Sequence, residues 1–293
     1  MHDFTFHALY QLLNSIKKQQ FIVQPFMEFI RNPVPKFVIL RHDVDKKETN
    51  SLLNAQIENL LGIVGTYYFR IVSGSFDENV IRRIYDLGHE IGYHYEDLAI
   101  AKGDHKKAIM LFEQNLAKLR RIVPVETICM HGSPLSRWDN RQLWKYYDYR
   151  DFGIIGEPYF DIDFDEVLYL TDTGRRWDGE SVSVRDKVEN LRGVEGKEKQ
   201  IDEEAVKLSL KTTITKNQGA VKSTEDKPYI RKFHSTFDII DAAESGTLPE
   251  KIMLTVHPQR WNNDMLPWLK ELIWQNAKNN GKWILNYVRN NNV

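Results

Sequence analysis

Short apolar runs alternate with helical patterns along most of the chain. The runs are four to seven residues long and rich in β-branched and aromatic side chains, which predicts strands at 37–40, 63–69, 89–94, 127–131, 153–156, 168–171 and 252–256. Apolar residues at helical spacing predict helices at 48–61 and 109–119 and around Leu143 and Leu269. A capping-box pattern at Ser75 and Glu78 marks the start of a further helix. This alternation is typical of an α/β fold with a parallel sheet or a barrel.

One stretch, from about 185 to 229, breaks the alternation. It is rich in charged residues and has few large apolar ones, so it has little surface to bury. We interpret it as a solvated surface insertion within a single domain spanning 1–293. The alternative interpretation is a mobile lid over a site.

Charge and composition exclude some classes of function. The 293 residues include 40 Lys and Arg against 41 Asp and Glu, which gives a net charge of −1. This balance provides no overall electrostatic attraction to nucleic acid or to an anionic membrane, and we expect neither as a partner. The hydrophobic fraction of 42% is sufficient for a sizeable core.

Compartment is predicted from two further features of the chain. The first 20 residues lack the basic start and apolar centre of a signal peptide, and no run reaches the roughly 18 apolar residues of a membrane span. We therefore expect a cytoplasmic protein. Cys129 is the only cysteine, so no internal disulfide forms, and we interpret it as a small buried apolar residue.

The candidate chemistry begins in the segment 41–45, Arg-His-Asp-Val-Asp, directly after the apolar run at 37–40. Strand side chains alternate, so Asp43 and Asp45 should share one face at the carboxyl end of a parallel strand. One carboxylate could bind a metal while the other accepts a proton from water. Arg41 is a candidate partner that would keep Asp43 ionised. The alternative is a turn with helix-capping aspartates.

Two other predicted strands end in histidine. The segment 88–94 reads Gly-His-Glu-Ile-Gly-Tyr-His, and 253–258 reads Met-Leu-Thr-Val-His-Pro. His94 and His257 would therefore lie at strand ends, where a neutral imidazole can bind a metal. Either one alone could equally be a hydrogen-bonded core histidine, but three strands ending in Asp or His together favour a site.

These three segments, in this order, resemble the polysaccharide deacetylase superfamily (NodB homology) from about Lys36 to His257. The resemblance implies a distorted (β/α) barrel of about seven strands. It also implies a hydrolase that removes N- or O-linked acetyl groups from sugars with a divalent metal, for which we expect zinc. Carried over to this sequence, Asp43 is the catalytic base and Asp45 and His94 are metal ligands. His257 is the acid that protonates the leaving group.

The chain departs from the family pattern at one ligand. The family's second metal histidine lies four residues after the first, and that position is occupied here by Leu98, which cannot bind a metal. We predict that His131, which also ends an apolar strand, supplies the third protein ligand of a zinc site. Glu96 and Asp97 are alternative donors, and loss of metal binding is a further alternative.

Residues after two of the strands are candidates for substrate binding. The resemblance implies that an arginine–aspartate pair and a tryptophan lie near the reacting groups, and we assign Asp172, Arg175 and Trp177 to this role. Arg260 and Trp261 follow His257 directly and would lie at the rim. The alternative for the first group is a polar loop with one anchoring aromatic residue.

The sequence therefore favours a metal-dependent hydrolase acting on an acetylated carbohydrate, and the expected cytoplasmic location favours a sugar precursor over a finished polymer. Two other hypotheses stay open. The first is a non-catalytic carbohydrate-binding relative without a complete metal triad. The second is a hydrolase of the same fold that acts on a non-sugar amide. The sequence does not predict the oligomeric state.

Overall fold

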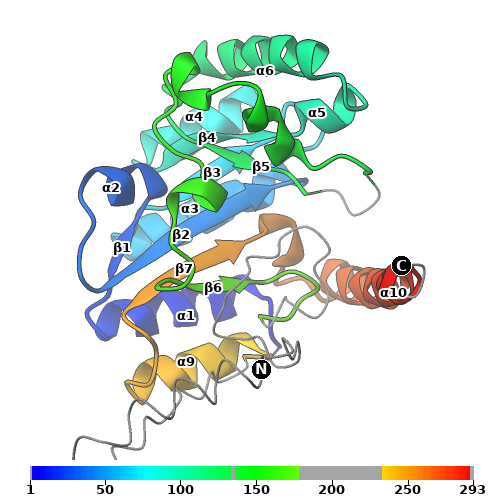
Figure 1. Ribbon diagram of the computed structural model, residues 1–293. Helices are drawn as coiled ribbons and strands as arrows, with labels where there is room; N and C mark the ends of the chain where they lie inside the picture. Colours follow the sequence, from blue (N-terminus) through cyan, green and yellow to red (C-terminus); the bar gives the residue numbers. More distant parts are fainter. Residues whose placement is uncertain (1, 133–135, 178–232, 291–293) are drawn as a thin grey trace, which may run out of the picture. The chain divides into compact units, whose positions relative to one another are not determined.

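A computed structural model describes residues 2–132, 136–177 and 233–290 (Figure 1). The strands are β1 Ile22–Gln24, β2 Phe37–Val44, β3 Thr66–Phe69, β4 Glu90–Tyr95, β5 Ile128–Met130, β6 Leu168–Thr171 and β7 Lys251–Val256. The helices are α1 Phe6–Lys18, α2 Phe26–Arg31, α3 Glu48–Leu60, α4 Glu78–Asp86, α5 Asp97–Ile100, α6 His105–Arg120, α7 Pro158–Asp161, α9 Thr236–Glu244 and α10 Met265–Asn290. Three 3-10 helices are η1 Asn140–Lys145, η2 Tyr149–Phe152 and η5 Pro258–Arg260.

All strands pair in parallel, in the order β5-β4-β3-β2-β7-β6, with β1 beside β2. The predicted α/β fold with a parallel sheet is confirmed. Within the described residues β5 and β6 do not pair with each other, so the sheet is a half-barrel. The carboxyl ends of all the strands therefore point the same way, and residues that follow different strands meet at one edge.

The two faces of the sheet differ in what covers them. The outer face is apolar: β3, β4 and β5 pack against α3, α4 and α6, while β2, β6 and β7 pack against α1 and α9 (Figure 1). The inner face is apolar only towards the amino ends of the strands, where Phe37, Ile39 and Met253 pack with Phe26 of α2. Towards the carboxyl ends the inner face becomes polar, and Arg41, Asp43 and Thr255 lie there buried.

Several predicted elements differ from those in the structure. The run at 153–156 forms no strand, although Gly156 bridges Thr127. The helix expected around Leu143 is the short η1. The capping box was wrong: Asp77 caps α4, and Ser75 donates instead to the carbonyl of Val44. α1, α9 and β1 were not predicted, and the insertion at 185–229 lies outside the described residues.

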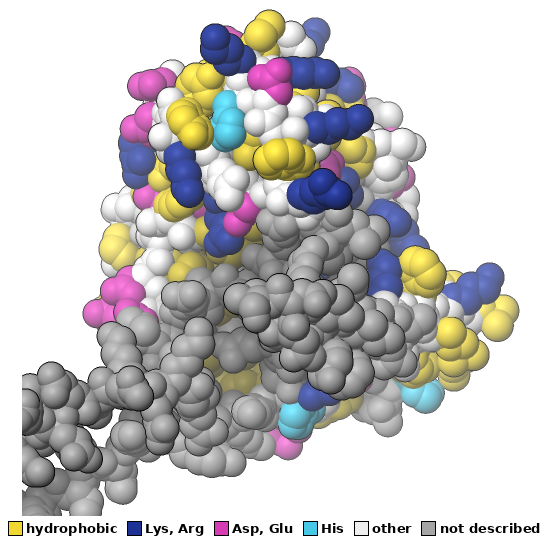
Figure 2. Space-filling view, turned by 45° about the vertical axis from the view of Figure 1, so that its right-hand side comes forward, with side chains coloured by type: hydrophobic (Ala, Val, Ile, Leu, Met, Phe, Trp, Pro, Cys, Tyr) yellow, Lys and Arg dark blue, Asp and Glu magenta, His cyan; other side chains and the backbone are white. Residues whose placement is uncertain are grey.

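Helix α10 is anchored on one side only. The Trp268 indole donates to the carbonyl of Asp3 at 2.7 Å, and Gln275 is buried. The opposite side of its first turns exposes Leu266, Leu269 and Ile273, and Figure 2 shows hydrophobic side chains on this part of the surface. No helix in the described part of the chain combines the length and the hydropathy needed to cross a membrane.

A buried polar group supports β2 from its outer face. The Nε2 atom of His42 lies 2.7 Å from the Glu58 carboxylate of α3, and both side chains are fully buried. His89 accepts from the backbone of Gly65 at 3.1 Å and lies 3.5 Å from the same carboxylate. The Tyr67 ring stacks on His42 with centroids 4.1 Å apart. Glu58 therefore joins α3 to the strand that carries Arg41, Asp43 and Asp45.

We predict that Glu58→Ala destabilises the fold by roughly 3–5 kcal/mol, because it leaves buried imidazole groups without their partner. Glu113→Ala, at an exposed position of α6, is the matched control and should change stability by less than about 0.5 kcal/mol. Urea denaturation followed by circular dichroism measures both changes. Equal stability of the two variants would show that the buried group contributes little.

Candidate metal centre

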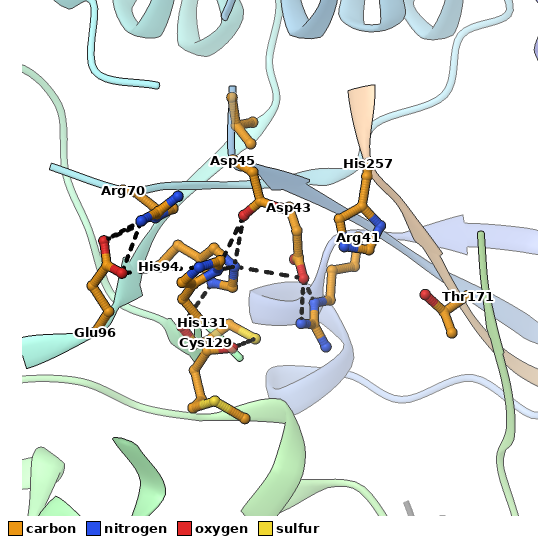
Figure 3. Close-up of polar contacts among 12 residues, drawn as sticks. Arg41, Asp43, Asp45, Arg70, His94, Glu96, Cys129, His131, Thr171 and His257 are labelled. Carbon is orange, nitrogen blue, oxygen red and sulfur yellow. Dashed lines mark hydrogen bonds and ion pairs between the residues drawn. The ribbon is translucent and has the colours of Figure 1, made fainter. Parts of the chain in front are cut away.

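Strand β2 delivers three charged side chains to the inner face of the sheet. Arg41 and Asp43 lie two residues apart, and the guanidinium donates to both carboxylate oxygens at 2.7 and 2.6 Å (Figure 3). Burial alone would raise the pKa of Asp43, but the charge of Arg41, with a smaller contribution from His94, lowers it to about 2. Asp43 is therefore ionised at neutral pH, as expected for a carboxylate held by a buried guanidinium.

Strand β4 places His94 opposite the aspartates. Glu90, Gly92 and His94 lie on the inner face, and Gly92 is required there because a Cβ atom would lie 2.3 Å from the Tyr68 ring. His94 Nδ1 lies 2.9 Å from the carbonyl oxygen of Cys129 and donates to it, which leaves the lone pair on Nε2. Burial lowers the pKa of His94 to about 4, so the imidazole is neutral and able to bind a metal.

His131 follows β5 and completes the group. Its backbone N–H donates to the carbonyl of Tyr95 at 2.9 Å, and its carbonyl accepts from Asn140 at the same distance. The side chain reaches Asp45, with Nδ1 3.1 Å from Oδ1, and lies 3.3 Å from Nε2 of His94. His131 therefore lies beside Asp45 and His94, the two residues with which it was predicted to bind a metal.

Three donor atoms converge from three strands. The distances among Asp45 Oδ1, His94 Nε2 and His131 Nδ1 are 3.1, 3.3 and 3.7 Å. Donors on a tetrahedral zinc ion at 2.0–2.1 Å lie roughly 3.3–3.4 Å apart, so this triangle fits such an ion. Asp45 Oδ1 is buried and, among the described residues, faces the imidazoles of His94 and His131. The three residues could therefore hold a divalent metal ion.

Leu98 and the two acidic residues before it make other contacts. Leu98 belongs to α5 and is fully buried in the hydrophobic core. Asp97 accepts from Tyr93 and Asn115. Arg70 donates to the Glu96 carboxylate at 2.6–2.9 Å, so this carboxylate is paired with a guanidinium.

Glu96 nevertheless lies beside the metal centre. One of its oxygens is 3.9 Å from His131 Nε2, on the far side of the ring from Asp45. That distance is longer than a hydrogen bond, so the contact is electrostatic. A carboxylate at this nitrogen favours the ring orientation in which Nδ1 faces the other two donors.

A second polar group surrounds His257 at the end of β7. His257 Nδ1 lies 2.6 Å from the fully buried Asp172 carboxylate. Arg260 and the Trp261 indole donate to that same carboxylate at 2.5 and 2.8 Å, and His257 donates its backbone N–H to it at 2.9 Å. Burial would raise the pKa of Asp172, but Arg260 and then His257 lower it. In the parallel register His257 lies one residue beyond the last paired position, beside Asp43.

The residues assigned to substrate binding have other positions. Trp177 and Trp261 are fully buried in the core rather than at a rim, and Trp177 donates to Thr236. Arg175 donates to the carbonyls of Trp268 and Asp3, so it ties α10 to the N-terminus. Asp172, Arg260 and Trp261 hold His257 instead of lining an open surface. These contacts follow from the burial of the side chains, which their residue types alone do not predict.

Two neighbours of the centre were not predicted as site residues. Gln259 donates its side-chain amide to Asp45 Oδ2 at 3.0 Å, so it fixes the oxygen that the imidazoles do not face. Cys129 is buried, as expected, but its sulfur lies within 4.8 Å of donor atoms of Asp43 and His94. Its position two residues before His131 was the available signal, because alternation places both on one face.

One cavity in the described part of the chain lies away from these donors. It has a volume of about 350 Å³ and is lined by η1, η2 and α7 residues that include Trp144, Tyr149 and Phe160. Its polar groups pair with each other: Tyr149 and Arg150 both donate to Asp161. None of the converging donors lines it.

Comparison with known proteins does not name a family. A scan against protein-family models, a search of curated proteins and a search of solved structures each gave no match. Two imidazoles and one carboxylate on a rigid sheet edge form a donor set typical of zinc sites that leave a coordination position for water.

We predict that His131→Ala weakens zinc binding by at least about 100-fold, because losing a donor atom costs more than the 10–100-fold typical of changes around a ligand. His7→Ala, an exposed histidine on α1, is the matched control and should bind zinc like the parent protein. Competition with a chromophoric chelator measures both affinities. Unchanged affinity in His131→Ala would assign the third donor to another residue, such as Glu96.

Proposed function

We propose that this chain is a metal-dependent hydrolase of the polysaccharide-deacetylase type that removes an acetyl group from a carbohydrate or sugar precursor. The observation that carries the proposal is the convergence of Asp45, His94 and His131, with donor atoms 3.1–3.7 Å apart. Beside it lie an ionised carboxylate, Asp43, and an oriented imidazole, His257. The order of the motifs along the chain, which resembles that superfamily, supplies the substrate class.

Zinc is the ion we propose for this centre. When bound there, it would lower the pKa of a water molecule and polarise the acetyl carbonyl. A site lacking the usual second histidine is a candidate for lost metal binding. The donor triangle that includes His131 instead favours a working centre over the hypothesis of a non-catalytic carbohydrate-binding relative.

Asp43 is proposed to accept the proton of the attacking water. With a pKa of about 2 it carries its charge at every physiological pH, and both of its oxygens are fixed by Arg41. A carboxylate with so low a pKa can accept a proton only from a water molecule whose own pKa is lowered. The proposal therefore requires Asp43 to lie beside the metal ligands. His94 Nε2 is 3.7 Å from Asp43 Oδ2, so base and ligands share one small volume.

His257 is proposed to protonate the departing amine or alcohol. Asp172 and Arg260 occupy the surroundings of Nδ1, at 2.6 and 2.7 Å, so Nε2 is the nitrogen left for substrate. The carboxylate fixes the ring orientation and stabilises the imidazolium that donates the proton. Trp261 and Arg260 act through Asp172, as residues that position the acid.

The experiment that tests this function measures acetate release by the zinc-loaded protein. Its panel contains N- and O-acetylated sugars, nucleotide sugars and simple acetamides. Release from acetylated sugars supports the proposal, whereas release from acetamides alone favours the hypothesis of a non-sugar amide hydrolase. No release from any member, by protein with one zinc bound per chain, would contradict it.

We predict that the two aspartates separate in their effects. Asp43→Asn should lower kcat/KM by about 10²–10⁴-fold, as expected for loss of a general base, and leave zinc affinity nearly unchanged. Asp45→Asn should weaken zinc binding itself, and added zinc should restore part of the activity. Asp151→Asn, at an exposed position of η2, controls for the substitution. Equal loss of zinc binding in both variants would show that the roles of base and ligand are not divided between the two aspartates.

A further inference from the structure

We propose that His94 serves two mutually exclusive metal positions. The outer set is the one already described, Asp45, His94 and His131. The inner set consists of Asp43, His94 and Cys129, and we infer that it binds thiophilic divalent ions such as Cd²⁺ in place of zinc. That such binding inhibits the protein rests on the role proposed for Asp43.

The inner set is assembled by the register of neighbouring strands. His94 of β4 is paired with Cys129 of β5, so both side chains point to the inner face at the same height. One ligand atom of each inner residue lies within 4.8 Å of the other two, and Asp43 Oδ2 is 3.7 Å from His94 Nε2. Figure 3 shows the Cys129 sulfur on the side of His94 away from Asp45. A shift of a few tenths of an ångström to one ångström would close this triangle to bonding geometry.

Only one set can be filled at a time. His94 Nδ1 is occupied by its hydrogen bond to the Cys129 carbonyl, so the ring offers a single lone pair, on Nε2. An ion in either set would have to use that lone pair. An ion in the inner set therefore removes one of the three donors of the outer set, and an ion in the outer set does the same to the inner.

The donor chemistry of the two sets selects different ions. The outer set offers one oxygen and two nitrogens, whereas the inner set offers oxygen, nitrogen and sulfur, and thiolate donors favour soft ions. Binding at Cys129 forms a metal–sulfur bond, and the thiol proton passes to solvent. All three inner residues are at most 2% exposed, so the ion would be shielded from competing water once bound.

Inner binding has a consequence that outer binding lacks. It uses the Asp43 carboxylate, which is the proposed base, as a ligand. A protein with an ion in the inner set would still contain one metal per chain but would have no free base. The identity of the ion, rather than its presence, would then decide whether the protein is active.

The test is a titration of the metal-free full-length protein with Cd²⁺, followed by the ultraviolet charge-transfer absorption of a cadmium–thiolate bond. Cys129 is the only cysteine, so this band reports on one residue. We expect the band at one Cd²⁺ per chain in the parent protein and in His131→Ala, which lacks only an outer donor. Cys129→Ser should lose the band, bind Cd²⁺ at least about 10-fold more weakly and keep its zinc affinity.

The controls separate this inference from a folding defect and from the proposed function. Cys129→Ser keeps the size of the side chain, and Cys129→Ala provides a second variant; melting temperatures verify that both fold. No thiolate band in Cd²⁺-loaded parent protein, or equal Cd²⁺ affinity in the parent and both variants, would overturn the inner set. Because the thiolate band does not depend on turnover, a band in the Cd²⁺-loaded protein together with no acetate release by the zinc-loaded protein would leave the inner set standing and reject the proposed hydrolase instead.

Discussion

The burial of Arg41 and Asp43 on one face of β2 is the constraint on which the rest of the site depends. A charge moved into the interior costs several kcal/mol unless it is paired, and here each group fixes the other through two hydrogen bonds of 2.6–2.7 Å. The pair keeps Asp43 ionised, and so makes a carboxylate available beside His94. On the opposite face of the same strand, His42 and Glu58 hold β2 against α3. The strand is therefore fixed from both sides at the residues that carry the chemistry.

Asp45 follows the last residue of β2. In the described part of the chain no guanidinium pairs with its carboxylate as Arg41 does with that of Asp43. Its Oδ2 accepts from Gln259, and its Oδ1 faces the imidazoles of His94 and His131. The nearby histidines lower its pKa well below the usual range against the opposing effect of burial, with His131 contributing most. A metal ion bound there would satisfy this oxygen and the lone pairs of the two imidazole nitrogens that face it. The two levels of the inner face thus differ: Asp43 is paired with Arg41, whereas Asp45 faces two imidazoles with which it could hold a metal ion.

The sequence predicted those features of the fold and the site that depend on local patterns, and it did not predict those that depend on contacts between residues far apart in the chain. Two patterns in the sequence predicted that Asp43, Asp45, His94 and His131 lie at one sheet edge. The first is the alternation of side chains along each strand, and the second is the alternation of strands and helices that indicates a parallel sheet. The direction of loop side chains is decided by partners far along the chain. Trp177 packs against Phe4 and Trp261, and no local pattern announces those contacts. The proximity of Cys129 to Asp43 likewise depends on strand order, β5 beside β4, which the sequence does not state.

A crystal of the zinc-loaded protein, measured on both sides of the zinc absorption edge, tests the central claim most directly. The account predicts one anomalous peak per chain, within about 2.0–2.2 Å of Asp45 Oδ1, His94 Nε2 and His131 Nδ1. Asp43 should remain paired with Arg41 and outside bonding distance of the ion. A peak bound to Glu96 in place of His131, or no peak near His94 at saturating zinc, would contradict it.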